Sequence, residues 1–252
     1  MSNVSSSEIR REFAKSKVGL IGIGILASLI ILSVIAAVTI PIDTFKQWNN
    51  PGNWISYPKT SVPIWINYFM TQKIPEHLIL DNPSTITKDD VISLTSHQFG
   101  VQYHYDDFPS DFIYEFSVEY SGSQLLQISV IRPDQSQILL LSRSLPHSDT
   151  KIVHHERIFS TDNSIKKNIQ IYFSEIGFYN QNTSSEDMIF ANKDGQVLKG
   201  DYLFLVNIYG VEEKVKIIDS KLILGGKAFG MMGTDELRRD LAVGLLWGTP
   251  LA

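Results

Sequence analysis

An uninterrupted apolar stretch near the N-terminus is the strongest hydrophobic pattern in the chain. Val18 to Ile42 contains no charged side chain, and its polar side chains are Ser28, Ser33 and Thr39. A helix of this length rises roughly 37 Å at about 1.5 Å per residue, and the hydrocarbon core of a bilayer is about 30 Å thick. The pattern therefore predicts a transmembrane helix over residues 18–42.

The charges that flank this stretch predict its orientation. More positive than negative side chains precede it: Arg10, Arg11, Lys15 and Lys17 against Glu8 and Glu12. Because Lys and Arg are retained on the cytoplasmic side, residues 1–17 are predicted to be a cytoplasmic tail, with the bulk of the chain outside the cell membrane. A cleaved signal peptide is an alternative suggested by the small residues at 36–38, although the stretch exceeds the usual h-region of about 7–15 residues.

Residues 43–99 form a Trp- and Pro-rich segment in which we expect short helices. Three of the four tryptophans lie there: Trp48, Trp54 and Trp65. Indole rings favour the membrane–water boundary, so Val62–Phe69 is interpreted as a segment on the outer membrane surface or against a helix bundle. A local hydrophobic cluster within the exported domain is the alternative. The sequence from Thr87 to Asp90 has the form of a capping box and predicts a short helix that ends near His97.

Beyond residue 99 the hydrophobic period changes to two. Phe112–Tyr120 alternates aromatic or aliphatic residues with smaller and polar ones, which predicts a strand with one buried face. Short apolar runs between turn residues predict further strands at 126–130, 138–141, 169–173, 202–209, 215–218 and 222–224. Residues 100–228 are therefore predicted to be an antiparallel β-sandwich of the immunoglobulin-like or jelly-roll type.

Composition and motifs give little support to catalysis or to cofactor binding. The net charge of −5 offers no basic surface for nucleic acid, and the absence of cysteine excludes disulfides and thiol chemistry. His154 and His155 are adjacent on a predicted strand and face opposite sides, so no metal site is expected there. No phosphate-binding loop or hydrolase motif occurs, and we expect neither an enzyme nor a cofactor.

Tyr103–Asp107 is interpreted as a solvated loop, with a ligand cleft as the alternative, and Asn182 lies in a possible glycosylation sequon.

The last residues, 229–252, read as a turn followed by a helix. Gly233 marks the turn, and Thr234 or Asp235 is expected to cap an amphipathic helix. The apolar face of that helix would comprise Leu237, Leu241, Gly244 and Leu245. A terminal helix that docks on a globular core is the alternative.

The two ends of the chain resemble permease subunits of the dipeptide/oligopeptide family of ABC transporters, of the archaeal type with a large extracytoplasmic insertion. In that family a first membrane helix is followed by an extracytoplasmic segment and a Gly-Thr-Asp-x-x-Gly-Arg-Asp motif that leads into the second helix. The residues that match the motif are Gly233, Thr234, Asp235, Arg239 and Asp240. Arg238 stands where the family has glycine, and Gly244 and Pro250 stand where it usually has basic residues.

The resemblance implies the N-terminal part of a permease that imports peptides or oligosaccharides. Its implied partners are a second permease subunit, ATP-binding subunits and an extracytoplasmic substrate-binding protein, and Gly233–Asp240 would act as an interface or gating motif. Because Leu245–Ala252 is too short to span a bilayer, we expect a fragment or a split gene product whose second membrane helix is missing. The alternative is a free-standing, membrane-anchored β-sandwich that binds a ligand or scaffolds a surface.

Overall fold

A computed structural model describes residues 15–89, 93–175, 184–210 and 215–251. The chain divides into two compact units. Unit 1 combines the N-terminal residues up to Ile55 with the C-terminal residues from Arg239, and unit 2 comprises Ser56–Arg238.

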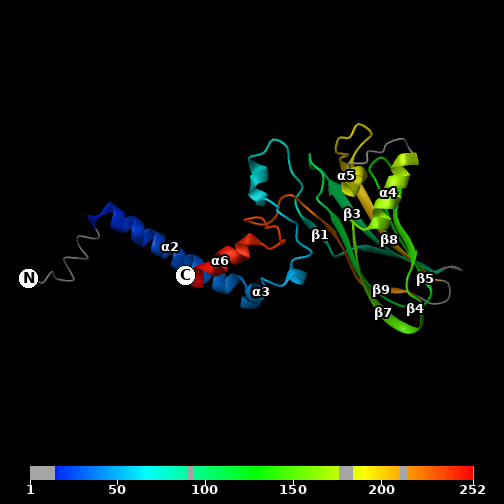
Figure 1. The fold of residues 1–252 in the computed structure, drawn as a ribbon, viewed down its shortest axis with the longest axis horizontal. Coiled ribbons are helices and arrows are strands. Elements are labelled where there is room, and N and C mark those ends of the chain that lie inside the picture. The colour runs from blue at the N-terminus through cyan, green and yellow to red at the C-terminus, as the bar shows by residue number, and fades with distance from the viewer. Residues whose placement is uncertain (1–14, 90–92, 176–183, 211–214, 252) are drawn as a thin grey trace, which may run out of the picture. The chain divides into compact units, whose positions relative to one another are not determined.

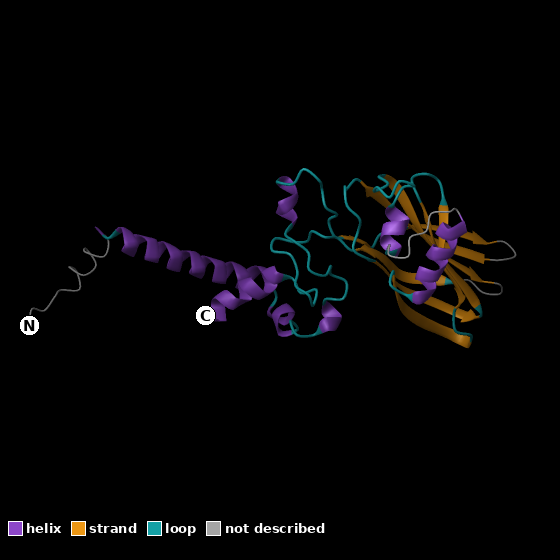
Figure 2. Ribbon diagram, turned by 45° about the horizontal axis from the view of Figure 1, so that its top comes forward, coloured by secondary structure: helices purple, strands orange, loops and turns teal. Residues whose placement is uncertain are grey.

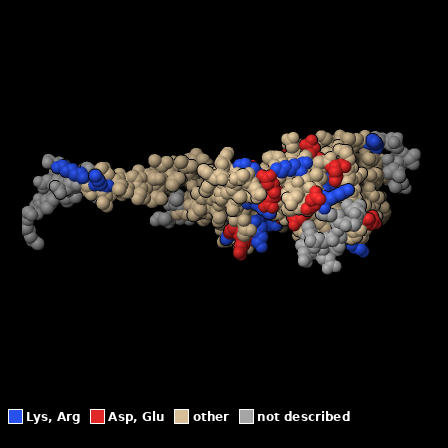
Figure 3. Space-filling model, turned by 90° about the horizontal axis from the view of Figure 1, so that it is seen from above, with Lys and Arg blue, Asp and Glu red and all other residues tan. Residues whose placement is uncertain are grey.

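Unit 1 is built around α2 (Lys17–Thr39), as the sequence predicts. The helix begins after Ser16, whose side chain accepts a hydrogen bond from the amide of Gly19. Its surface carries no charged side chain beyond Lys17, and most of its apolar side chains are exposed (Figure 3). Within the described residues it is the one helix that is long and apolar enough to cross a membrane. The short elements α3 (Ile42–Lys46) and η1 (Pro51–Asn53) follow it.

The C-terminal helix differs from the prediction. Residues 233–240 are not helical, and α6 (Leu241–Leu251) begins only after them. An α-helix cannot include Gly233 and Arg238, because both have a positive φ, at 75° and 65°. The expected amphipathic helix that includes Leu237 is therefore wrong, and α6 is apolar around its whole circumference and extends past Pro250. It packs against α2 (Figure 1).

Unit 2 contains the predicted antiparallel sandwich of two sheets (Figure 2). The four-stranded sheet has the order β1 (Leu78–Leu80), β9 (Lys216–Leu224), β4 (Phe112–Gly122) and β7 (Ser148–Phe159). The five-stranded sheet has the order β2 (Ser84–Asp89), β3 (Ser93–Tyr103), β8 (Gly200–Gly210), β5 (Gln124–Ile131) and β6 (Gln137–Ser144). Every pairing of neighbouring strands is antiparallel.

The alternation in β4 places its predicted face in the core between the sheets. Its inward side chains are at most 3% exposed: Phe112, Tyr114, Phe116, Val118 and Tyr120. Facing side chains from the five-stranded sheet include Leu126, Ile128 and Phe204, each fully buried. Burial of a side chain of this size contributes about 1.5–3 kcal/mol, so this shared core holds the two sheets together.

Two segments form a different element from the one that their sequence predicts. Residues 169–173 lie in α4 (Asn163–Glu175), which packs on β6 and on α5 (Ser185–Phe190). Its buried side chains follow a helical spacing of four: Ile165, Ile169 and Phe173. The helix predicted from Thr87 to His97 is absent, because Thr87 lies in β2 and His97 in β3. The first strand of unit 2 begins at Leu78, whereas the β-sandwich is predicted to begin at residue 100.

Other expectations concern shorter features. Val62–Phe69 contains the 3-10 helix η2 (Ile64–Tyr68), in agreement with the short helices expected before residue 99. The strand β7 carries His154 and His155 on opposite faces, as predicted. Asn182 lies outside the described residues.

Candidate functional site

The motif residues from Gly233 to Arg238 lie in a substructure of unit 2 that we call the collar, which comprises residues 56–76 and 225–238. Backbone hydrogen bonds join its two segments, although 148 residues separate them in the chain. These bonds include Val62 N to Lys227 O at 2.9 Å, Phe229 N to Val62 O at 2.8 Å and Ile64 N to Gly230 O at 3.0 Å. The collar is therefore a fixed structure formed by both ends of unit 2.

Gly233 allows the two backbone segments of the collar to approach closely, and Thr234 joins them through its buried hydroxyl. A Cβ atom on Gly233 would lie 2.2 Å from the carbonyl oxygen of Ser61, and its φ of 75° is one that glycine adopts readily. Thr234 is 4% exposed, and its Oγ1 accepts a hydrogen bond from the amide of Ser61 at 3.0 Å. The same hydroxyl donates to the carbonyl of Pro58 at 2.7 Å. Both motif residues thus hold the first collar segment in place.

Asp235 and Arg238 complete a tight turn. The Asp235 carboxylate accepts a hydrogen bond from the amide of Leu237 at 2.9 Å, and its carbonyl accepts from the amide of Arg238 at 3.1 Å. The Arg238 guanidinium donates to the carbonyl of Tyr57 at 2.6 Å and pairs with the Asp111 carboxylate at 2.8 Å. Arg238 has a φ of 65°, a left-handed conformation that glycine adopts more readily than arginine. The guanidinium contacts offset part of a backbone cost of about 1–2 kcal/mol.

The motif ends in unit 1, where Arg239 and Asp240 have different surroundings. The Arg239 guanidinium lies 4.9 Å from the centre of the Trp48 ring, and Asp240 accepts a hydrogen bond from the amide of Ala242 at the start of α6. A Cβ atom on Gly244 would lie 2.7 Å from the Trp48 ring, so glycine permits this indole to approach α6. Arg239 and Asp240 are therefore engaged within unit 1, while Gly233, Thr234 and Asp235 belong to unit 2.

The loop from Tyr103 to Asp107 ties the collar to the sandwich. The Asp106 carboxylate accepts a hydrogen bond from the amide of Lys73 at 2.7 Å, and the Asp107 carboxylate pairs with Lys227 Nζ at 2.8 Å. Tyr103 is 1% exposed and donates its hydroxyl hydrogen to the carbonyl of Asp107. These contacts give the loop a structural role that neither sequence interpretation included.

A half-buried histidine also contacts the collar. His77 directly precedes β1, and its ring meets the Phe229 ring edge-on at 5.4 Å. Burial lowers the pKa of His77 to about 4, an effect that the carboxylate of Asp111 opposes and the charge of Arg238 reinforces. The imidazole is therefore neutral at physiological pH.

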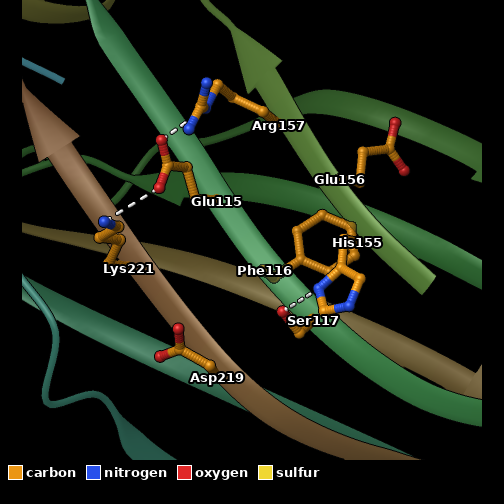
Figure 4. A pocket seen from close by; sticks show the side chains of 8 residues that line it. All are labelled: Glu115, Phe116, Ser117, His155, Glu156, Arg157, Asp219 and Lys221. Carbon is orange, nitrogen blue, oxygen red and sulfur yellow. Dashed lines mark hydrogen bonds and ion pairs between the residues drawn. The ribbon is translucent and has the colours of Figure 1, made fainter. Parts of the chain in front are cut away.

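The outer face of the four-stranded sheet carries a cluster of polar side chains that the sequence analysis did not predict (Figure 4). Glu115 on β4 lies between two cations, with Arg157 Nε at 2.5 Å and Lys221 Nζ at 3.0 Å. Beside them, Ser117 Oγ and His155 Nδ1 are 2.7 Å apart, and the side chains border a hollow of about 340 Å³. Alternation along β4 marks Glu115 as outward-facing, but its partners depend on the strand register.

The electrostatics of this cluster favour an ionised Glu115. Burial acts to raise the pKa of Glu115, but the hydrogen bond and charge of Lys221, together with the charge of Arg157, outweigh it and hold that pKa below its usual range. On the other face of β7, His154 contacts Glu156 at 3.2 Å. The hollow thus offers paired charges, a hydroxyl and an imidazole, which suit hydrogen bonding to a polar ligand.

No protein-family model matches this chain, and no curated protein sequence does. Similar solved structures include dimeric latent PorU from Porphyromonas gingivalis, with 9% identity over 62% of this chain and a TM-score of 0.30. This chain spans only 13% of PorU. The carbohydrate-binding module TmCBM61 in complex with β-1,4-galactotriose has 7% identity, coverage of 62% of this chain and 89% of that chain, and a TM-score of 0.23. The module CBM28, specific for non-crystalline cellulose, has 4% identity, coverage of 59% and 79%, and a TM-score of 0.24.

Proposed function

We propose that this chain is a membrane-anchored part of an import channel that resembles the dipeptide/oligopeptide ABC permeases and carries a β-sandwich outside the membrane. In this proposal α2 crosses the membrane, unit 2 is exported, and α6 starts a second passage. Peptides or oligosaccharides are the substrates, and the partners are a second permease subunit, ATP-binding subunits and an extracytoplasmic binding protein.

One observation carries this proposal beyond a simple membrane anchor, namely the packing of α6 against α2 (Figure 1). A protein with a single anchor needs no second apolar helix, whereas a channel subunit must return to the membrane after each exported segment. The helix α6 is apolar on all sides, as expected of a segment that contacts both lipid and other helices. Asp240 caps its first turn at the end where the chain would enter the bilayer.

The motif Gly233–Asp240 then has a specific role at the outer face. Its first part fixes the collar of unit 2, and its last two residues directly precede α6 in unit 1. It therefore links the exported domain directly to the re-entering helix. In the assembled transporter, Asp235→Ala and Arg239→Ala are expected to lower substrate uptake while membrane insertion stays normal.

Topology can be tested cleanly because the chain contains no cysteine. Single variants Ser7→Cys, Lys193→Cys and Leu245→Cys are expressed in cells and treated with a membrane-impermeant maleimide. We expect rapid labelling of Lys193→Cys in intact cells and labelling of Ser7→Cys only after permeabilisation. Leu245→Cys, in the middle of α6, should stay unlabelled until the protein is denatured, because a thiol in lipid does not ionise.

The same variants distinguish the proposal from its alternative. Labelling of Leu245→Cys from outside, at the rate of Lys193→Cys, would show that α6 does not enter the membrane and would reject the channel. Protection of Lys193→Cys in intact cells would reject export of the sandwich altogether.

The second candidate is a free-standing anchored sandwich that binds a polar ligand. The specific observation in its favour is the hollow beside Glu115, on the outer sheet face (Figure 4). This candidate requires one membrane crossing only, so exposure of Leu245→Cys would favour it. Loss of ligand binding in Arg157→Ala and Lys221→Ala would then identify the outer face as the site.

A further inference from the structure

Unit 2 exposes a group of large apolar side chains that we call the aromatic patch. Trp65 is 49% exposed, Tyr68 82%, Phe69 84% and Met231 74%. The first three belong to or directly follow η2, whereas Met231 lies in the other collar segment. Single exposed apolar residues are common, but a group drawn from two distant segments indicates a contact surface.

The collar holds this patch in a defined arrangement. The amide of Ile64 donates to the carbonyl of Gly230 at 3.0 Å, which places η2 beside the second segment. The indole Nε1 of Trp65 donates to the carbonyl of Met231 at 2.9 Å, and the Trp65 and Phe69 rings lie 6.3 Å apart, edge to face. The polar atom of the indole is thus satisfied within the protein, and its apolar surface remains outside.

The charges around the patch favour a lipid surface as its partner. Residues 60–72 and 228–234 contain no charged side chain. The nearest charged residues that flank these two segments are Lys59, Lys73 and Lys227, with Asp235 as the single acid. Trp and Tyr prefer the level of lipid headgroups, and the exposed Lys59 suits a lipid phosphate, whereas Lys227 is paired with Asp107.

The length of the connecting chain limits the distance between the patch and α6. Met231 precedes Leu241 by ten residues, which span at most about 36 Å when fully extended. A bilayer entered by α6 is therefore within reach of the aromatic patch. This step rests on the proposed membrane passage of α6.

We infer that the aromatic patch inserts into the headgroup region of the outer leaflet and gives unit 2 a second attachment to the membrane besides the helices. Trp65 and Phe69 enter the interface, and Met231 extends the apolar surface from the other segment. The attachment restricts the orientation of the sandwich relative to the bilayer.

The depth of Trp65 provides the first test. The full chain, with Trp48, Trp54 and Trp247 replaced by Phe, is placed in phosphatidylcholine vesicles brominated either near the headgroup or deep in the acyl chains. We expect a blue-shifted Trp65 emission that shallow bromines quench at least twofold more than deep ones. The control carries a single tryptophan at Val153→Trp, on the outer sheet face, and should be quenched by aqueous iodide instead.

A second measurement avoids the tryptophan substitutions in unit 1. Phe69→Cys in the otherwise unchanged chain is labelled with a nitroxide and compared with Val153→Cys. Collisions with oxygen relative to a water-soluble nickel complex should be several-fold more frequent at position 69, because oxygen concentrates in lipid.

The outcomes separate this inference from the proposed function. Iodide quenching of Trp65 equal to that of the control, or equal collision ratios at positions 69 and 153, would overturn it. A blue-shifted Trp65 that no brominated lipid quenches would assign the patch to a protein partner or a second copy, and would also overturn it. Release of the chain from membranes by alkaline carbonate would reject membrane anchoring, and with it both the proposed function and this inference. Retention of the chain together with iodide quenching of Trp65 would overturn the inference alone.

Discussion

The hydroxyl of Thr234 provides the sharpest test of how the motif holds the collar. Thr234→Val keeps the shape of the side chain but removes the group that accepts from Ser61 N and donates to Pro58 O. All three residues are buried, so water cannot readily replace the lost partner. Each unsatisfied buried group costs about 1–3 kcal/mol, so for the two lost partners we expect a total loss of about 2–6 kcal/mol in the local stability of the collar.

Hydrogen exchange measured by mass spectrometry reports this local stability. A loss of about 2–6 kcal/mol corresponds to an exchange rate that is roughly 30- to 20,000-fold higher for collar amides such as Val62 and Phe229. The amides of β4 serve as an internal standard, because local opening of the collar leaves the sandwich core intact. The reconstituted full chain is used throughout.

Thr234→Ser is the matched control. It retains the hydroxyl and loses one methyl group, which costs about 0.8 kcal/mol and should accelerate exchange by roughly fourfold. If Thr234→Val exchanges no faster than Thr234→Ser, the hydroxyl is not what holds the collar, and the reasoning is refuted.

Three further predictions concern the same region. Gly233→Ala should open the collar far more than Gly195→Ala, because both glycines have φ near 75° but only the first would bring its Cβ against backbone; equal exchange rates in the two variants would contradict this. The collar should lose about 3 kcal/mol of stability as pH falls from 6.5 towards 4, because His77 takes up its proton at a higher pH in the unfolded state than in the folded state. A His77→Phe variant whose collar stability does not change over this pH range would identify His77 as the group responsible. Arg238→Gly should fold with a thermal midpoint close to that of the parent chain, whereas Arg238→Val, which loses the Asp111 pair and disfavours a positive φ, should lower it by several degrees.

The sequence is most informative where the hydrophobic pattern of a short segment is enough to predict its secondary structure. In α2 nearly every position after Lys17 is apolar, so no register or partner is needed to predict a membrane-length helix. In β4 the alternation of Phe112–Tyr120 coincides with the face that the second sheet covers. The antiparallel sandwich followed from such strands, although their order in the two sheets did not.

Errors arose where a local signal competed with pairing by distant residues. The capping-box pattern at Thr87–Asp90 favours a helix, but pairing with β3 makes Thr87 part of a strand. The apolar residues 169–173 have no clear period in a short window, and only packing against β6 shows the helical spacing of Ile165, Ile169 and Phe173. Likewise, no local signal predicts that Lys221 and Arg157 flank Glu115, because strand register depends on the whole sheet.

For the residues from Gly233 to Asp240, the sequence by itself predicted that Gly233 begins a turn. Only the tertiary structure decided what those residues contact. Thr234 meets Ser61 and Pro58 across more than 170 residues, and Arg238 adopts a positive φ that a helix excludes. The reason is physical: caps, turns and apolar periods depend on neighbours in the chain, whereas buried hydrogen bonds and left-handed turns depend on which distant segment packs against them.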